Sequence, residues 1–223
     1  KTTFYAVSGG QVGDSGVIKN SDDNAFIVAD TAKNADGIYL HKGEVSRGII
    51  SVGDTVSVSI NAERRKAIMR NHTAAHLLQA ALRQVLGTHV EQAGQLVDET
   101  EVRFDFTHFN PMTDEEIAKV EMTVNNFILS AQPVTMQEMP IDDAKKMGAM
   151  MLFGEKYGDI VRVVKAGDFS TEFCGGTHVS NSGQIGLFKI VSESSVAAGV
   201  RRIIAYTGHS TLAYLNLNES VVK

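Results

Sequence analysis

His72-Thr73-Ala74-Ala75-His76 is the stretch from which the fold of this chain can be worked out. It lies in a segment from Asn61 to about Leu86 where apolar residues recur at helical spacing, with no glycine or proline before Gly87. The pattern predicts a helix with both histidines in its rigid middle. Residues four apart share one helix face, so the two imidazoles can converge on one ion. A lone His-x-x-x-His is a weak signal by itself, because it arises often by chance.

Cys174-Gly175-Gly176-Thr177-His178 offers a second pair of donors almost a hundred residues later. The two glycines let the backbone turn sharply enough for Cys174 and His178 to point at a common centre. Thiolate and imidazole together suit zinc, which is usually tetrahedral with ligand distances of about 2.0–2.3 Å. The two stretches therefore predict zinc held by His72, His76, Cys174 and His178. The alternative is a buried, inert thiol with unrelated surface histidines.

The composition is that of a globular protein, with 223 residues, 43% hydrophobic and 21% charged. No apolar run approaches the roughly 20 residues that span a bilayer, and we expect no membrane partner. The single cysteine cannot form an internal disulfide, which fits a reducing, cytoplasmic setting. The chain starts without Met and enters dense motif at once, so we expect it to be a piece of a longer protein.

The formal charge of −5 argues mildly against nucleic acid, and we expect no DNA partner. Local clusters matter more than net charge, however, and Arg64-Arg65-Lys66 and Arg201-Arg202 are two such clusters. They indicate either an RNA-facing surface or ordinary solvated side chains.

Residues 1–60 carry short apolar runs separated by Gly, Asn and Asp, a spacing that predicts a small antiparallel barrel or sheet. Within them, Ser8 to Gly16 holds four glycines in nine residues. Such a segment lets a ligand approach the backbone closely and exposes several N–H groups, a plausible cradle for phosphate or ribose. A plain hairpin loop is the alternative.

The rest of the chain mixes helices with paired strands, which favours an α+β fold over a doubly wound sheet. Expected strands are 88–97, 101–107, 134–138, 160–164, 186–191 and 200–206, the last two joined by a connection at 192–199. Expected helices are one opened by the capping box Thr113–Glu116 and ending near Ala131, a short one from Pro140 to about Gly148, and one from His209 to the end. A turn is expected at Gly154–Gly158.

Six motifs together resemble the editing region of alanyl-tRNA synthetases of the bacterial type. They are Ser8-Gly-Gly-Gln-Val-Gly-Asp-Ser-Gly16, Asn71-His-Thr-Ala-Ala-His-Leu-Leu78, Arg103-Phe-Asp-Phe106, Gly154-Glu-Lys-Tyr157, Phe169-Ser-Thr-Glu-Phe-Cys-Gly-Gly-Thr-His178 and Ala198-Gly-Val-Arg-Arg-Ile203. The zinc-ligand pattern is shared with freestanding alanyl-tRNA editing proteins and, in related form, with the threonyl-tRNA synthetase editing domain. The N-terminal glycine motif resembles the alanyl lineage.

The resemblance implies a β-barrel subdomain with a glycine-rich loop at 1–60, a zinc-dependent α+β editing core at 61–208, and a helix at 209–223 leading to a further region. It implies an aminoacyl-tRNA deacylase, within an alanine–tRNA ligase, that hydrolyses Ser-tRNA(Ala) and Gly-tRNA(Ala). The expected partners are the acceptor end of tRNA(Ala) and the remainder of the synthetase. The alternative is a tRNA-binding module with a structural zinc and no activity in isolation.

The resemblance places Gln92 in the pocket. The family often has Thr where this chain has Ala75, and Ser where it has Gln95. Catalytic candidates are Gln92, Thr73 and Cys174, the first two as groups that could read a serine hydroxyl. Candidates for tRNA binding are Ser8, Gly9, Gly10, Gln11, Gly13, Arg201 and Arg202. Thr73 stands where His-Glu-x-x-His peptidases have glutamate, which argues against a peptidase.

Overall fold

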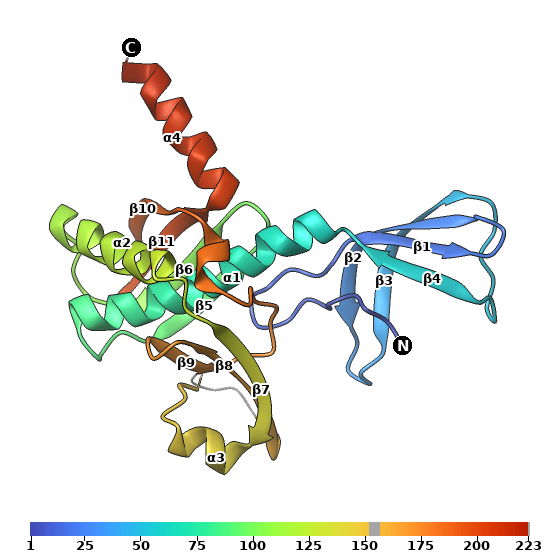
Figure 1. The fold of residues 1–223 in the computed structure, drawn as a ribbon, viewed down its shortest axis with the longest axis horizontal. Helices are drawn as coiled ribbons and strands as arrows, with labels where there is room; N and C mark the ends of the chain where they lie inside the picture. The colour runs from blue at the N-terminus through green and yellow to red at the C-terminus, as the bar shows by residue number, and fades with distance from the viewer. Residues whose placement is uncertain (152–156, 223) are drawn as a thin grey trace.

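The structure, a computed structural model, describes residues 1–151 and 157–222 and has an α+β architecture (Figure 1). Its strands form three antiparallel sheets, with strand orders β3-β2-β1-β4, β10-β11-β6-β5 and β7-β8-β9. The turn expected at Gly154–Gly158 lies mostly outside the described residues.

The first sheet projects to one side of the molecule, at the right of Figure 1. Its strands are β1 (Gly16–Asn20), β2 (Ala25–Lys33), β3 (Tyr39–Arg47) and β4 (Val56–Ile60). The predicted barrel is wrong, because β3 and β4 lie at opposite edges and do not pair within residues 1–60, all of which are described. The sheet is therefore open, and β3 is exposed along almost its whole length.

Helix α1 (Ala62–Leu86) runs from this sheet through the centre of the molecule. The Asn61 side chain caps it by accepting a hydrogen bond from the backbone N–H of Arg64. Every residue from Asn71 to Gln79 is buried, so this part of the helix is surrounded by protein. The predicted helix is confirmed, and so is the central position of the two histidines.

The second sheet packs against α1 and helix α2 (Asp114–Leu129) to form the main core. Its strands are β5 (Gln92–Val97), β6 (Val102–Thr107), β10 (Phe188–Ala197) and β11 (Val200–Thr207). Phe104 and Phe106 of β6 meet Leu77, Leu78 and Leu82 of α1 in a fully buried cluster. The capping box of Thr113 and Glu116 is present at the start of α2, as predicted.

The third sheet lies below the main core in Figure 1, with a small helix at its lower end. It consists of β7 (Val134–Pro140), β8 (Ile160–Ala166) and β9 (Ser170–Phe173), with α3 (Ile141–Lys146) between β7 and β8. A short helix, η1 (Ser182–Ile185), leads from this sheet towards β10, and α4 (Gly208–Val222) extends away from the body.

Besides the open first sheet, the structure differs from the sequence expectations at β10 and at β9. The connection predicted at 192–199 is wrong, because β10 continues to Ala197 and pairs with β11, for example Ser195 with Arg201. The polar run has the composition of a loop, yet its backbone groups complete the ladder, and the residues from Ser194 to Ala197 stay exposed. Strand β9 was not predicted, and it carries the chain into the Cys174–His178 turn.

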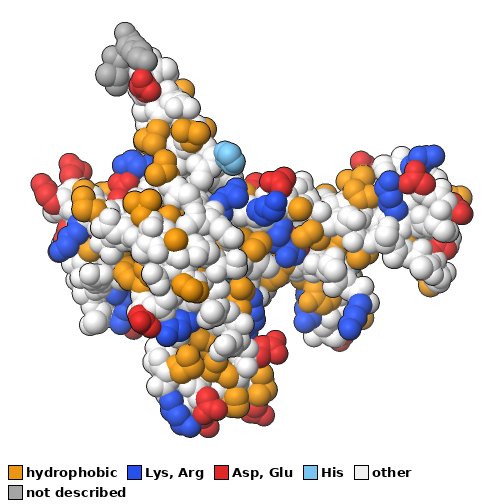
Figure 2. All heavy atoms as spheres, viewed as in Figure 1, with side chains coloured by type: hydrophobic (Ala, Val, Ile, Leu, Met, Phe, Trp, Pro, Cys, Tyr) orange, Lys and Arg blue, Asp and Glu red, His pale blue; other side chains and the backbone are white. Residues whose placement is uncertain are grey.

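The surface mixes both signs of charge. Figure 2 shows acidic and basic side chains interspersed over the visible face. In the described part of the chain, no helix has both the length and the apolar character needed to cross a bilayer.

Candidate metal centre and adjoining pocket

The four predicted ligands lie together although they come from two distant stretches. His72 and His76 stand on α1, Cys174 follows β9 directly, and His178 closes the next turn. Their donor atoms all lie within 4.8 Å of one another, and Cys174 Sγ is 3.5 Å from His72 Nε2 and 3.3 Å from His178 Nε2. This group could hold a metal ion, and its three imidazoles and one thiolate suit zinc.

The Cys174–His178 turn is shaped by one glycine and one arginine. A Cβ atom at Gly176 would lie 2.0 Å from His72 Cε1, so only glycine lets the turn approach the helix this closely. Arg162 Nη1 donates to the carbonyl oxygens of Cys174 (2.9 Å) and Gly176 (2.6 Å). These two bonds hold the turn against β8.

His76 is backed by a buried carboxylate. Glu172 Oε2 lies 3.2 Å from His76 Nδ1, within ion-pair distance although not aligned as a hydrogen bond. Glu172 Oε1 accepts a hydrogen bond from Ser170 Oγ at 2.8 Å. Such a carboxylate behind a ligating imidazole orients the ring and partly balances the charge of a bound cation.

His178 is backed by Thr73. The Thr73 hydroxyl donates to Met69 O (2.9 Å), accepts from the backbone N–H of Val179 (3.2 Å), and lies 3.2 Å from His178 Nδ1. Because its one hydrogen is used by Met69, the consistent arrangement has His178 Nδ1–H donating to Thr73. Thr73 therefore contacts a candidate ligand, and it is not among the residues that line the pocket.

His72 is backed by Gln11, whose Oε1 lies 2.7 Å from His72 Nδ1. The same amide bonds to Thr177, and the side chain is fully buried. Gln11 was expected to face tRNA, whereas the structure places it inside, behind the donor group.

The protonation preferences fit a metal-ligand role. Burial raises the pKa of the Cys174 thiol, but the charges of His72 and His76 and hydrogen bonds from His178 and His72 outweigh it and hold the pKa well below its usual range. Burial, reinforced by the charge of His72, lowers the pKa of His178 to about 3. Thiolate and neutral imidazole are the forms that bind metal.

The pKa of His76 moves the other way. Burial lowers it, but the charges of Glu172 and Cys174 prevail and raise the pKa to about 9. A cation at Nε2 would take the place of the second proton on that ring. The donor set therefore fits zinc in donor chemistry and charge.

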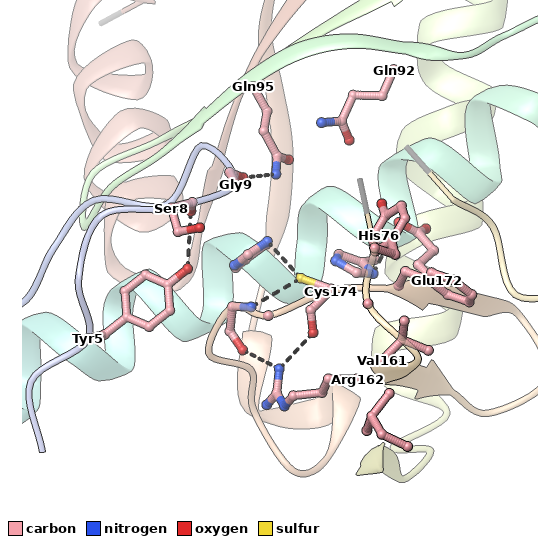
Figure 3. A pocket seen from close by; sticks show the side chains of 17 residues that line it. Tyr5, Ser8, Gly9, His76, Gln92, Gln95, Val161, Arg162, Glu172 and Cys174 are labelled. Atoms are coloured by element: carbon pink, nitrogen blue, oxygen red, sulfur yellow. Dashed lines mark hydrogen bonds and ion pairs between the residues drawn. The ribbon is translucent and has the colours of Figure 1, made fainter. Parts of the chain in front are cut away.

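A cavity of about 280 Å³ opens beside the donor group (Figure 3). Gln92 and Gln95 of β5 lie on one side of it, Tyr5 and Ser8 on another, and Arg162 and Glu172 lie near the donors. Figure 3 marks no hydrogen bond to the Gln92 amide from the other residues drawn. The Gln92 amide can therefore meet a ligand without first breaking a bond to these neighbours.

The glycine-rich loop covers part of this cavity. Ser8 and Gly9 line it, and Gln95 Nε2 donates to Gly9 O at 2.6 Å. Gly10 has a φ of +81°, and a Cβ there would lie 2.6 Å from Gln95 O. Gly13 packs instead against Thr31 of the first sheet. Of the five loop residues expected at the tRNA, only Ser8 and Gly9 therefore face the cavity.

Arg201 and Arg202 lie on β11 and do not line the cavity. Arg201 pairs with Glu193 through two bonds of 2.5 and 2.7 Å, and Arg202 pairs with Asp105 through two bonds of 2.7 and 2.8 Å. Arg201 is also largely buried. Both arginines that were expected to contact phosphate are therefore already paired with a carboxylate.

Sequence reasoning missed Glu172 and Arg162. One signal could have found the first: Ser170, Glu172 and Cys174 alternate, and alternation places strand residues on one face. No comparable signal marks Arg162, because its role depends on the turn that β9 brings beside β8.

Comparison with known proteins shows which sequences this chain is similar to. Residues 161–204 match the family described as the threonyl and alanyl tRNA synthetase second additional domain, and residues 1–64 match class II (A) tRNA synthetases. The alanine–tRNA ligase of Fervidobacterium nodosum is 56% identical over 99% of the chain. Those of Staphylococcus saprophyticus and Acetivibrio thermocellus are 54% identical over 99% and 100% of it.

The chain spans about 25% of the length of each of these relatives. The resemblance to alanyl-tRNA synthetases inferred from the motifs is thereby confirmed, and the chain corresponds in sequence to one segment of these enzymes.

Proposed function

We propose that this segment is an editing module that hydrolyses the ester of Ser-tRNA(Ala) and Gly-tRNA(Ala). The observation that carries the proposal is that a group of three histidines and one cysteine adjoins a small cavity, which the glycine-rich loop covers in part. At about 280 Å³ the cavity lies at the low end for ligand sites, so it suits the aminoacylated end of a tRNA more than a whole acceptor stem. The same proposal names the rest of a parent synthetase as a partner of this segment, and the cytoplasm as its location.

Ester hydrolysis needs an oriented substrate, an attacking water and a group that stabilises the developing oxyanion. His72, His76, Cys174 and His178 are the residues that would hold zinc. Held by three of them, the ion would keep an open coordination position and supply a Lewis-acid anchor for the substrate amino group or a ribose hydroxyl, whereas held by all four it would be a structural ion. Ser8 and Gly9 border the cavity, and their backbone would position the ribose. Arg162 lines the cavity near the donors and supplies positive charge there, while its Nη1 holds the turn.

Size cannot explain the proposed selectivity, because glycine is smaller than alanine and serine is larger. A polar side chain that hydrogen-bonds to the serine hydroxyl can favour serine over alanine. If the Gln92 amide bonds to the serine hydroxyl, alanine leaves that amide unpaired, at a cost of about 1–3 kcal/mol in a dry site. Thr73 cannot act in the same way directly, since its hydroxyl is bonded behind His178.

The test is release of serine from Ser-tRNA(Ala) incubated with the chain, with a chelator and then with zinc restored. The proposal expects hydrolysis that the chelator abolishes and zinc restores, with Ala-tRNA(Ala) cleaved far more slowly. Binding of Ser-tRNA(Ala) without hydrolysis, at saturating zinc, would instead favour a tRNA-binding module with a structural metal.

A further inference from the structure

Gln11 joins three segments that are far apart in the sequence: the glycine-rich loop, α1 and the Cys174–His178 turn. Its Oε1 lies 2.7 Å from His72 Nδ1 and accepts a hydrogen bond from Thr177 N–H at 2.8 Å. Its Nε2 donates to Thr177 Oγ1 at 2.9 Å. Gln11 has no exposed surface, so these bonds are made away from water.

These bonds fix which atom of the Gln11 amide faces which neighbour. A backbone N–H can only donate, so the Gln11 atom that faces Thr177 N must be the oxygen. The same oxygen faces His72 Nδ1, and an oxygen without hydrogen can only accept. His72 Nδ1 must therefore carry a hydrogen.

The tautomer of His72 follows from this. A neutral imidazole has one N–H, so hydrogen on Nδ1 leaves the lone pair on Nε2. Nε2 is the atom that faces Cys174 Sγ, at 3.5 Å. The backbone of Thr177 thus determines, through Gln11, which nitrogen of His72 can bind a cation.

We propose that Gln11 is a positioning residue of the metal centre, which holds His72 as the Nδ1–H tautomer and ties the glycine-rich loop to the ligands. The proposal rests on the zinc centre proposed above. Partners of this kind behind a ligand contribute 10- to 100-fold to metal affinity. Without Gln11, the His72 Nδ1–H and the Thr177 N–H would both lose their acceptor inside the protein.

Zinc affinity of four chains, measured by competition with a chromophoric chelator, tests this role. Gln11→Met keeps the length and removes the amide, and we expect affinity to fall about 10- to 100-fold. Gln11→Glu keeps an acceptor for both N–H groups, so its affinity is expected to stay close to that of the unchanged chain. The matched control is Gln95→Met, because the Gln95 side chain also bonds to the loop, at Gly9 O, and forms no hydrogen bond to a candidate ligand among the described residues. Its affinity should not change.

The Gln11 variants should fold, because the loop keeps two backbone bonds to β5, from Val12 N to Val97 O and from Val97 N to Gly10 O. Gln11→Asn, which withdraws the amide by one carbon, gives a second test and should weaken zinc binding as Gln11→Met does. Circular dichroism and thermal unfolding of each variant separate a lost site from a lost fold.

A spectroscopic readout distinguishes positioning from general support of the structure. The visible spectrum of the cobalt-loaded chain and the ¹⁵N signals of His72 in the zinc form should change in Gln11→Met, and not in Gln95→Met. The proposed role of Gln11 would be overturned if Gln11→Met left zinc affinity and spectra unaltered, or if Gln95→Met lost as much zinc affinity. Neither result would contradict the zinc centre. An unchanged chain that binds no zinc would overturn the zinc centre itself, which is a separate result.

Discussion

The first sheet and the α1 core are both regular, but they differ in what surrounds their side chains. Strand β3 is exposed along almost its whole length, whereas α1 is buried at every position from Asn71 to Gln79. All four candidate ligands lie on or against the buried helix, and none lies on the sheet. Donors need fixed geometry, and packing on all sides supplies it where exposed pairing does not.

The glycine-rich loop is the region where the two environments meet. Asp14, at its sheet end, is buried and pairs with Arg65 of α1. Ser8 and Gly9, at the other end, line the cavity. The loop therefore connects the first sheet to the site, and its position depends on contacts with both.

The largest expected effect is on metal content. Cys174→Ala combined with His76→Ala removes two of four donors, and we expect the purified chain to lose its stoichiometric zinc in elemental analysis. His89→Ala is the control, since His89 is exposed and pairs with His108 away from the donor group. Zinc retained in full by the double variant would disprove the assignment of these ligands.

Core and sheet should also differ in stability. Phe104→Ala empties a fully buried position against α1 and should lower the free energy of unfolding by about 3–5 kcal/mol. Val45→Ala, at a half-exposed position of β3, should cost about 0.5 kcal/mol or less. Denaturant unfolding of the two variants measures both. Equal losses would mean that the sheet is buried in solution as thoroughly as the core.

A smaller effect is expected at the cavity wall. Gln92→Met keeps the volume and removes the amide, so hydrolysis of Ser-tRNA(Ala) should fall about ten- to a hundredfold, which is about 1.4–2.8 kcal/mol. The slow cleavage of Ala-tRNA(Ala) should stay the same or rise. Equal loss for both substrates would place Gln92 in the shared apparatus, and no change would give it a structural role only.

The smallest effect concerns the paired arginines. Because Arg201 and Arg202 are already bonded to Glu193 and Asp105, replacing both with alanine should leave the salt dependence of tRNA binding unchanged. A phosphate contact would be revealed by a slope of log affinity against log salt that becomes shallower by about 0.7–0.9 for each arginine. That result would support the sequence-based assignment of these residues to the tRNA surface.

Sequence alone determined the elements and the donors whose signal is local. Helical periodicity predicted α1, the capping box predicted the start of α2, and the spacing within each of the two motifs selected His72, His76, Cys174 and His178. These inferences hold because four residues of helix, or two glycines in a turn, restrict geometry over short distances whatever surrounds them.

Only the tertiary structure decided the rest, because it depends on which distant segments meet. Closure of the first sheet required a pairing of β3 with β4 that the strand order does not provide. The roles of Gln11, Thr73 and Glu172 behind the three histidines, and the carboxylate partners of Arg201 and Arg202, are likewise contacts between segments. The sequence does not distinguish a polar side chain that bonds inside the protein from one that faces a ligand. Its burial in the folded chain does.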